Sequence, residues 1–371
     1  MNARVEGRSL GRWVRQALAS ALALAVWTPA SASAYDLGPQ FSLHGFFDME
    51  YHQASAFEGM ERGDASDPSN GAFRQHHVNF FVDARVRPDL VAKAHIEMEY
   101  GADTELGYGG IILEYGFIDY ALRGDLLRLR AGKLLTPFGF YNEIHDSSPA
   151  FLSVSIPWVL YKGSAMGGFS ALPKWITGLS FTGGYDLPKG HHDLNYALYI
   201  GNGESVGSND HYYDDNPNKA VGARVEFVTH KETFKAALSG YYGDKAVTPE
   251  KRAEQHSAAV LSLEYAPGPL NIHGEYAWAA VAGWRESVWY LMASYRLGKL
   301  TPYARYQFID PDDEEGNDTW GAATGGINYL VNSNLIFKAE HTIHDRGSEN
   351  LAIAHDTPDF SETQVALTLF F

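Results

Sequence analysis

The chain ends in "ETQVALTLFF", Glu362–Phe371, where large apolar side chains recur at every second position. Successive side chains of an extended chain point to opposite faces, so Val365, Leu367 and Leu369 share one face with Phe371. The last residues of most chains are poorly ordered unless the rest of the fold holds them. Two phenylalanines in this position therefore predict a strand whose apolar face rests against something other than water.

The first 34 residues have the pattern of a secretory signal peptide. Four arginines come first, an apolar run follows at Ala17–Trp27, and two overlapping small-residue cleavage sites lie in Pro29–Ala34. The apolar run is too short to span a membrane. We therefore expect a signal peptide over residues 1–34 and a mature domain over residues 35–371.

The composition excludes several classes of function. The chain has 45 acidic residues against 29 basic ones and a formal net charge of −16, and the arginine-rich leader contributes to the basic count. A nucleic-acid partner would require a basic surface for its phosphates, so we expect none. There are no cysteines, which excludes disulfides and metal–thiolate sites. A large core or a closed sheet must hold the fold.

Alternation with period two runs through the rest of the sequence. The segments 41–52, 77–86, 90–100 and 334–344 each set apolar side chains on one face against charged or polar ones on the other. A soluble sandwich also alternates. Its strands average about five or six residues, however, whereas these runs reach the 9–11 or so residues of a tilted membrane strand. We interpret the apolar face as lipid-facing and the charged face as lining a lumen.

Short and long links alternate along the chain. Tight turns are predicted at 87–89, 123–125, 230–232, 267–269, 298–299 and 332–333. Longer polar segments separate them, which is the pattern of a bacterial outer-membrane barrel with short periplasmic turns and longer extracellular loops. The predicted fold is an all-β, antiparallel transmembrane β-barrel of sixteen strands, with eighteen as the alternative. In such a barrel the last strand pairs with the first.

The longest link, at about 136–175, follows the fifth strand and is too apolar for a loop exposed to water. Phe138 and Phe151 are among its many large apolar residues. Folding inward against the barrel wall would bury them. We therefore predict that this link is a constriction loop that carries Glu143 and Asp146 to the narrowest part of the channel.

Charges of both signs fall on predicted lumen-facing positions. In "LLRLRAG" (126–132), Leu127 and Leu129 face lipid, so Arg128 and Arg130 face the lumen. Rings of charge filter ions electrostatically, although such residues can also simply pair across neighbouring strands. The candidate pore-constriction residues are Arg128, Arg130, Arg85, Glu143, Asp146, Lys93, Glu97 and Glu99.

An outer-membrane hydrolase is the alternative from another class of function. Ser147, Ser148 and His145 are the only close set for serine chemistry, and the G-x-S-x-G nucleophile motif is missing. The histidine pairs 76–77 and 191–192 would point to opposite faces of a strand, so they cannot chelate a metal together. We expect no enzymatic activity, no metal and no cofactor.

Three short stretches resemble Gram-negative porins, closest to the phosphate-selective porin O and P group. They are "LRLRAGKLLTPFGFYNE" (127–143), "LNYALYIGNG" (194–203) and "AALSGYYG" (236–243). The resemblance implies a homotrimer of sixteen-stranded barrels in the lipid of the bacterial outer membrane, passing small hydrophilic solutes or ions by diffusion.

In that group a ladder of arginine and lysine attracts phosphate. Arg128 and Arg130 fit such a ladder, but the predicted inward acids outnumber the inward bases. The sequence therefore leaves open a general pore, a cation-tolerant pore and an anion- or phosphate-selective pore.

Overall fold

The computed structural model describes residues 40–55, 71–100, 110–144, 147–161, 172–187, 192–204, 218–245, 254–281, 284–311, 319–346 and 360–371. The predicted signal peptide, residues 1–34, lies outside these ranges.

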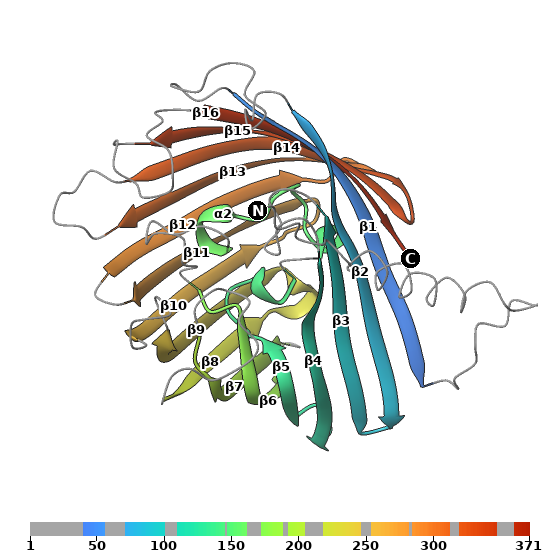
Figure 1. Ribbon diagram of the computed structural model, residues 1–371, viewed down its shortest axis with the longest axis vertical. Helices are drawn as coiled ribbons and strands as arrows, with labels where there is room; N and C mark the ends of the chain where they lie inside the picture. Colours follow the sequence, from blue (N-terminus) through green and yellow to red (C-terminus); the bar gives the residue numbers. More distant parts are fainter. Residues whose placement is uncertain are drawn as a thin grey trace, which may run out of the picture. The chain divides into compact units, whose positions relative to one another are not determined.

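The described residues form sixteen strands in one closed barrel (Figure 1). The strands are β1 (Phe41–Ala54), β2 (Ala72–Arg87), β3 (Leu90–Tyr100), β4 (Gly110–Arg123), β5 (Leu127–Leu135), β6 (Trp175–Leu187), β7 (His192–Asn202), β8 (Lys219–Val228), β9 (Phe234–Lys245), β10 (Glu254–Tyr265), β11 (Leu270–Val281), β12 (Trp284–Tyr295), β13 (Leu300–Pro311), β14 (Trp320–Asn332), β15 (Leu335–Arg346) and β16 (Phe360–Phe370). Each strand pairs with its neighbours in sequence, and β1 pairs antiparallel with β16. The predicted sixteen-stranded barrel is therefore confirmed, and the closed ring excludes the alternative of eighteen strands.

The two faces of the strands differ as the alternation predicts. In β1, Phe47 and Met49 are 41% and 43% exposed, whereas Asp48 and Glu50 are 0% and 7% exposed. The apolar side chains thus lie on the outside of the barrel and the charged ones on the inside, the reverse of a soluble sandwich.

A β-bulge interrupts this regularity in β4. The pairing of β3 with β4 shifts between His95 and Ile96, where Glu114 is the extra residue of β4. Because side chains alternate with period two, one inserted residue reverses the faces of every residue after it. The bulge turns Asp119 toward the lumen, where strict alternation from the start of β4 would have placed it on the lipid side.

The seam between β1 and β16 holds the end of the chain. The backbone N–H groups of Gly45 and Phe371 each donate to the other's carbonyl oxygen, both at 3.0 Å. Phe46 is opposite Phe370 in the register, and the ring of Phe80 contacts that of Phe371 at 6.3 Å between centroids. The prediction that the last strand pairs with the first is confirmed.

Short helices occur mainly in the link between β5 and β6. There η2 (Asn142–Ile144), η3 (Ser148–Ala150) and α2 (Trp158–Tyr161) follow one another, and η4 (His230–Glu232) lies between β8 and β9. No helix in the described part of the chain is long and apolar enough to cross a membrane.

We predict that Gly45→Val destabilises the barrel at its seam. A Cβ atom at Gly45 would lie 2.2 Å from the carbonyl oxygen of Asn79 and 3.0 Å from the ring of Phe371. Such overpacking costs about 1–3 kcal/mol, so the urea midpoint for unfolding in lipid vesicles should fall.

Gly240→Val is the matched control, because it also lies on the outer face of a strand and its added Cβ meets nothing within 4 Å. Equal midpoints for the two variants would contradict the predicted role of the seam.

Candidate functional site

The described parts of the β5–β6 link, 136–144, 147–161 and 172–174, make many contacts with inward-facing side chains of the barrel. We call the two stretches 136–144 and 147–161 together the inner segment. The N–H groups of Val154 and Ser155 donate to the carboxylate of Glu340 in β15 at 2.9 and 3.1 Å. The N–H of Phe140 donates to Glu275 in β11 at 2.7 Å. Lumen carboxylates thus satisfy backbone donors that would otherwise be buried without a partner.

Lys338 in β15 binds backbone carbonyl groups of the inner segment. Its ammonium group donates to the carbonyl oxygens of Ser148, Phe151 and Ser153 at 2.6, 2.8 and 3.0 Å. The ammonium also lies 4.6 Å from the centroid of the Phe151 ring. Lys338 is only 1% exposed, and a buried cation is tolerated only with such partners. It is therefore an anchor of the segment.

Neighbouring strands supply further anchors. Arg305 in β13 donates to the carbonyl oxygen of Ser155 at 2.7 Å, and Asn328 in β14 donates to that of Leu152 at 2.9 Å. The ring of Trp158 in α2 meets that of Trp320 in β14 edge to face, with centroids 5.0 Å apart. The inner segment therefore covers the arc of the wall from β11 to β15.

A tyrosine and a glycine shape the start of the inner segment. The N–H of Tyr141 donates to the Tyr161 hydroxyl at 3.1 Å, and this hydroxyl donates to Glu275. Burial and the negative charge of Glu275 raise the pKa of Tyr161, so the hydroxyl keeps its proton as a donor. Gly139 has a φ of +67°, and a Cβ there would lie 2.1 Å from the Tyr161 hydroxyl, so this turn requires glycine.

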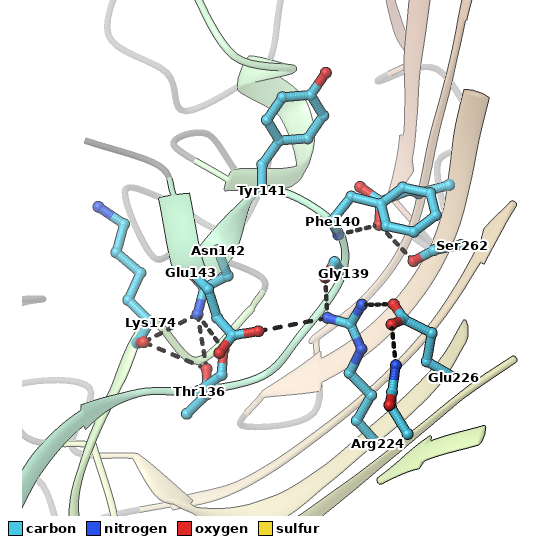
Figure 2. A network of polar contacts seen from close by, with 12 residues as sticks. Thr136, Gly139, Phe140, Tyr141, Asn142, Glu143, Lys174, Arg224, Glu226 and Ser262 are labelled. Atoms are coloured by element: carbon cyan, nitrogen blue, oxygen red, sulfur yellow. Dashed lines mark hydrogen bonds and ion pairs between the residues drawn. The ribbon is translucent and has the colours of Figure 1, made fainter. Parts of the chain in front are cut away.

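Arg224 in β8 joins the inner segment to the opposite part of the wall, as Figure 2 shows. Its Nη1 donates to the carbonyl oxygen of Gly139 at 2.6 Å and lies 3.8 Å from the Glu143 carboxylate. Its Nη2 donates to Glu226, which also accepts from Asn195 at 3.1 Å. The charge of Arg224 is therefore matched by two carboxylates.

A cavity of about 440 Å³ lies beside Arg224, between the inner segment and the inner faces of β3 to β8. A second cavity, of about 740 Å³, shares Asn195, Arg224 and Glu226 with the first. The charged residues that line the first cavity are Lys93, Asp125, Arg128, Arg130, Glu143, Arg224 and Glu226. We call this first cavity the basic cavity.

Two arginines of the basic cavity share one buried carboxylate. The Nε atoms of Arg128 and Arg130 donate to the two oxygens of Asp119 at 2.8 and 3.1 Å, and the Asp119 side chain is 4% exposed. Asp125 lies 3.4 Å from Arg128, but its side chain is 99% exposed and water screens it. The alternative that these arginines pair across strands is therefore correct in part, and the buried carboxylate of Asp119 balances one of the two positive charges.

The predicted constriction residues fall into three groups. Lys93, Arg128, Arg130 and Glu143 come together around the basic cavity. Arg85 and Glu97 line neither cavity: Arg85 is exposed on β2, and Glu97 is 1% exposed in the wall, where it accepts from Asn79 at 3.4 Å. Asp146 and the side chain of Glu99 lie outside the described residues.

The residues considered for serine hydrolysis and for metal binding do not form such sites within the described ranges. The Ser148 hydroxyl donates to Asp48 of β1 at 2.6 Å, so it serves as a contact between the inner segment and the wall. His145 lies outside the described residues. Within the described ranges, no three or more histidine and carboxylate side chains are grouped so that they could hold a metal ion.

Sequence reasoning did not select Asp119 or the anchors Lys338, Arg305, Glu275 and Glu340. For Asp119 the only signal is the interrupted alternation in "ILEYGFIDY" (112–120). The others were predicted only as lumen-facing, because alternation gives the face of a strand and not what lies against it.

A family model described as Gram-negative porin matches residues 19–346. The chain belongs to the Gram-negative porins. Family and fold together make it an outer-membrane channel for small solutes. No curated protein matches this porin in sequence.

Several solved structures share the fold of this porin. The anion-selective porin from Comamonas acidovorans is 13% identical, with a TM-score of 0.62 over 89% of this chain and 99% of that one. OmpF of Salmonella typhi, solved with daunomycin, is 12% identical, with a TM-score of 0.59 over 89% and 97% of the two chains. The channel DcaP of Acinetobacter baumannii is 12% identical, with a TM-score of 0.57 over the same shares. At such identities the likeness concerns the fold.

We predict that Lys338→Met loosens the inner segment. The change removes the common donor of three carbonyl groups, and a hydrogen bond from a charged group contributes about 1.5–3 kcal/mol. Single-channel conductance should become larger or noisier, and limited chymotrypsin digestion within 136–161 should accelerate.

Lys299→Met is the control, because Lys299 also donates to a backbone carbonyl, that of Val331 at 2.9 Å, but at an exposed turn. Conductance and digestion of Lys338→Met equal to those of this control would contradict the anchoring role.

Proposed function

We propose that this porin conducts small hydrophilic solutes and ions along the open arc of its lumen, beside β3 to β8, and that it prefers anions. The observation that carries the proposal is the pairing of Arg128 and Arg130 with one shared carboxylate, Asp119, at the edge of the basic cavity. An excess positive charge on a water-filled path attracts anions and repels cations.

The acidic excess of the sequence does not oppose this proposal. Asp48, Glu275 and Glu340 are each at most 3% exposed, and each accepts hydrogen bonds from the inner segment. Because they are covered by the segment they anchor, they do not line the open arc. The side chains of Lys93 and Arg130, in contrast, are 40% and 32% exposed.

The inner segment is proposed as the element that narrows the channel. Its anchors lie on β11 to β15, and its Glu143 lies at the basic cavity with a side chain that is 44% exposed. Charges of both signs therefore line the same passage: Lys93, Arg128, Arg130 and Arg224 lie on the wall with Asp125 and Glu226, and Glu143 lies on the segment.

Phosphate specificity is the finer alternative, and the arrangement of charges favours a general anion preference over it. A phosphate ladder would need several basic residues without partners. Here Arg224 binds Glu226 and lies near Glu143, and Lys93 lies 3.5 Å from Asp83. The Comamonas acidovorans porin, described as anion-selective, shares the fold that this proposal requires.

The joint substitution Arg128→Ala with Arg130→Ala should shift ion selectivity toward cations. The two substitutions take the group formed by Arg128, Arg130 and Asp119 from a net charge of +1 to −1. At about 1 kcal/mol per unit charge at 4 Å in water, this change of two charges corresponds to about a thirtyfold change in the permeability ratio. The measurement is the reversal potential in a KCl gradient across a planar bilayer.

Arg87→Ala with Arg123→Ala is the charge-matched control, since neither of these residues lines the basic cavity. A reversal potential that moves equally in both double variants, or in neither, would exclude Arg128 and Arg130 from the filter.

We further propose that three copies of this porin assemble. The OmpT porin-fold protein of Vibrio cholerae, 13% identical, is described in a trimer form. Native mass spectrometry of the detergent-extracted protein should therefore give three times the mass of the mature chain. A mass of one chain under conditions that keep the barrel folded would contradict this assembly.

A further inference from the structure

We propose that the basic cavity binds aromatic monocarboxylates, so that the porin distinguishes organic anions by their rings as well as by their charge. The inference rests on the proposed function, which supplies the open path and the anion preference. The inference adds a class of ligand to that function. Its basis is a set of aromatic side chains next to Arg130, which a filter for simple inorganic ions would not need.

The first observation is an aromatic surface beside the guanidinium group. Tyr115 and Phe117 of β4 line the same cavity as Arg130. The Arg130 guanidinium lies 5.5 Å from the centroid of the Phe117 ring, and the two rings are 5.5 Å apart with their planes 42° from parallel. Leu134 and Ile176 are further apolar residues of the lining.

The second observation is that only one nitrogen of the Arg130 guanidinium group is hydrogen-bonded within the described residues. Arg130 donates through Nε to Asp119, and its two Nη atoms have no hydrogen-bond partner within the described part of the chain. An arginine can offer parallel N–H groups to both oxygens of a carboxylate. The two Nη groups of Arg130 are therefore available to an anion that enters the cavity.

The third observation is that the rings are held in place before any ligand arrives. Tyr115 packs against His95 at 5.3 Å between ring centroids, and His95 stacks on Phe81 at 4.2 Å with planes 22° apart. His95 is 2% exposed. A surface that is already ordered loses little freedom when a ligand binds, which favours affinity.

These features together select a class of ligand. The cavity of about 440 Å³ is within the usual range for small-molecule sites and has room for a benzoate-sized anion. Inorganic phosphate or acetate would use the charge and leave the aromatic surface without a partner. A neutral sugar would offer no negative charge to the Nη groups of Arg130. An aromatic carboxylate satisfies both.

The test is block of the chloride current in planar bilayers by three anions of equal charge: benzoate, cyclohexanecarboxylate and acetate. Cyclohexanecarboxylate matches benzoate in size but lacks the planar ring. Ring pairing with Phe117 and Tyr115 should lower the half-blocking concentration of benzoate about fivefold relative to cyclohexanecarboxylate. Acetate should block least.

Two substitutions assign the preference to named groups, with block measured relative to the current of each variant. Phe117→Leu should bring the half-blocking concentrations of benzoate and cyclohexanecarboxylate together. Arg130→Gln should raise both of them. Phe181→Leu is the matched control, because Phe181 lies on the outer face of β6 with 40% exposure, and it should keep the fivefold preference.

Equal block by benzoate and cyclohexanecarboxylate in the wild type would overturn the inference, as would a preference that survives Phe117→Leu. These results differ from failure of the proposed function, which would give no stable current or a reversal potential that favours cations. A chloride-preferring channel without ring preference would therefore refute the aromatic site alone.

Discussion

Pairing of the backbone hydrogen-bonding groups is the constraint on which the rest of this porin depends. The hydrocarbon core of a bilayer offers no water, so each N–H and C=O group there must find a partner within the protein. A ring of strands meets this requirement only when it is closed. The contact of Gly45 with Phe371 at the seam is therefore as necessary as any contact in the middle of the sheet.

The same requirement explains how the lumen is divided. The inner segment is irregular backbone inside a barrel, and its N–H and C=O groups are satisfied by Glu340, Lys338 and Arg305 of the wall. On the arc from β11 to β15, these charged side chains are hydrogen-bonded to the inner segment. The opposite arc keeps Arg128 and Arg130 at a cavity, and the proposed anion preference follows from that asymmetry.

Much of the fold could be predicted because lipid and water act on opposite faces of every strand. Alternation in 41–52 and 334–344 placed Asp48 and Lys338 inside the barrel, where they lie. The alternating turns and loops gave the number of strands. Asp119 shows the limit of this reasoning, because one bulge at Glu114 reverses the face of every later residue in β4.

By itself, the sequence determined the barrel, the strand count and the inward face of Arg128, Arg130 and Lys93, since periodicity is a local property of the chain. Only the tertiary structure decided which of these charges meet. Arg224 reaches Gly139 across 85 residues of sequence, and Lys338 reaches Ser148 across 190. Such contacts depend on how strands from distant parts of the chain close around the inner segment. The period-two alternation does not indicate which distant residues will meet.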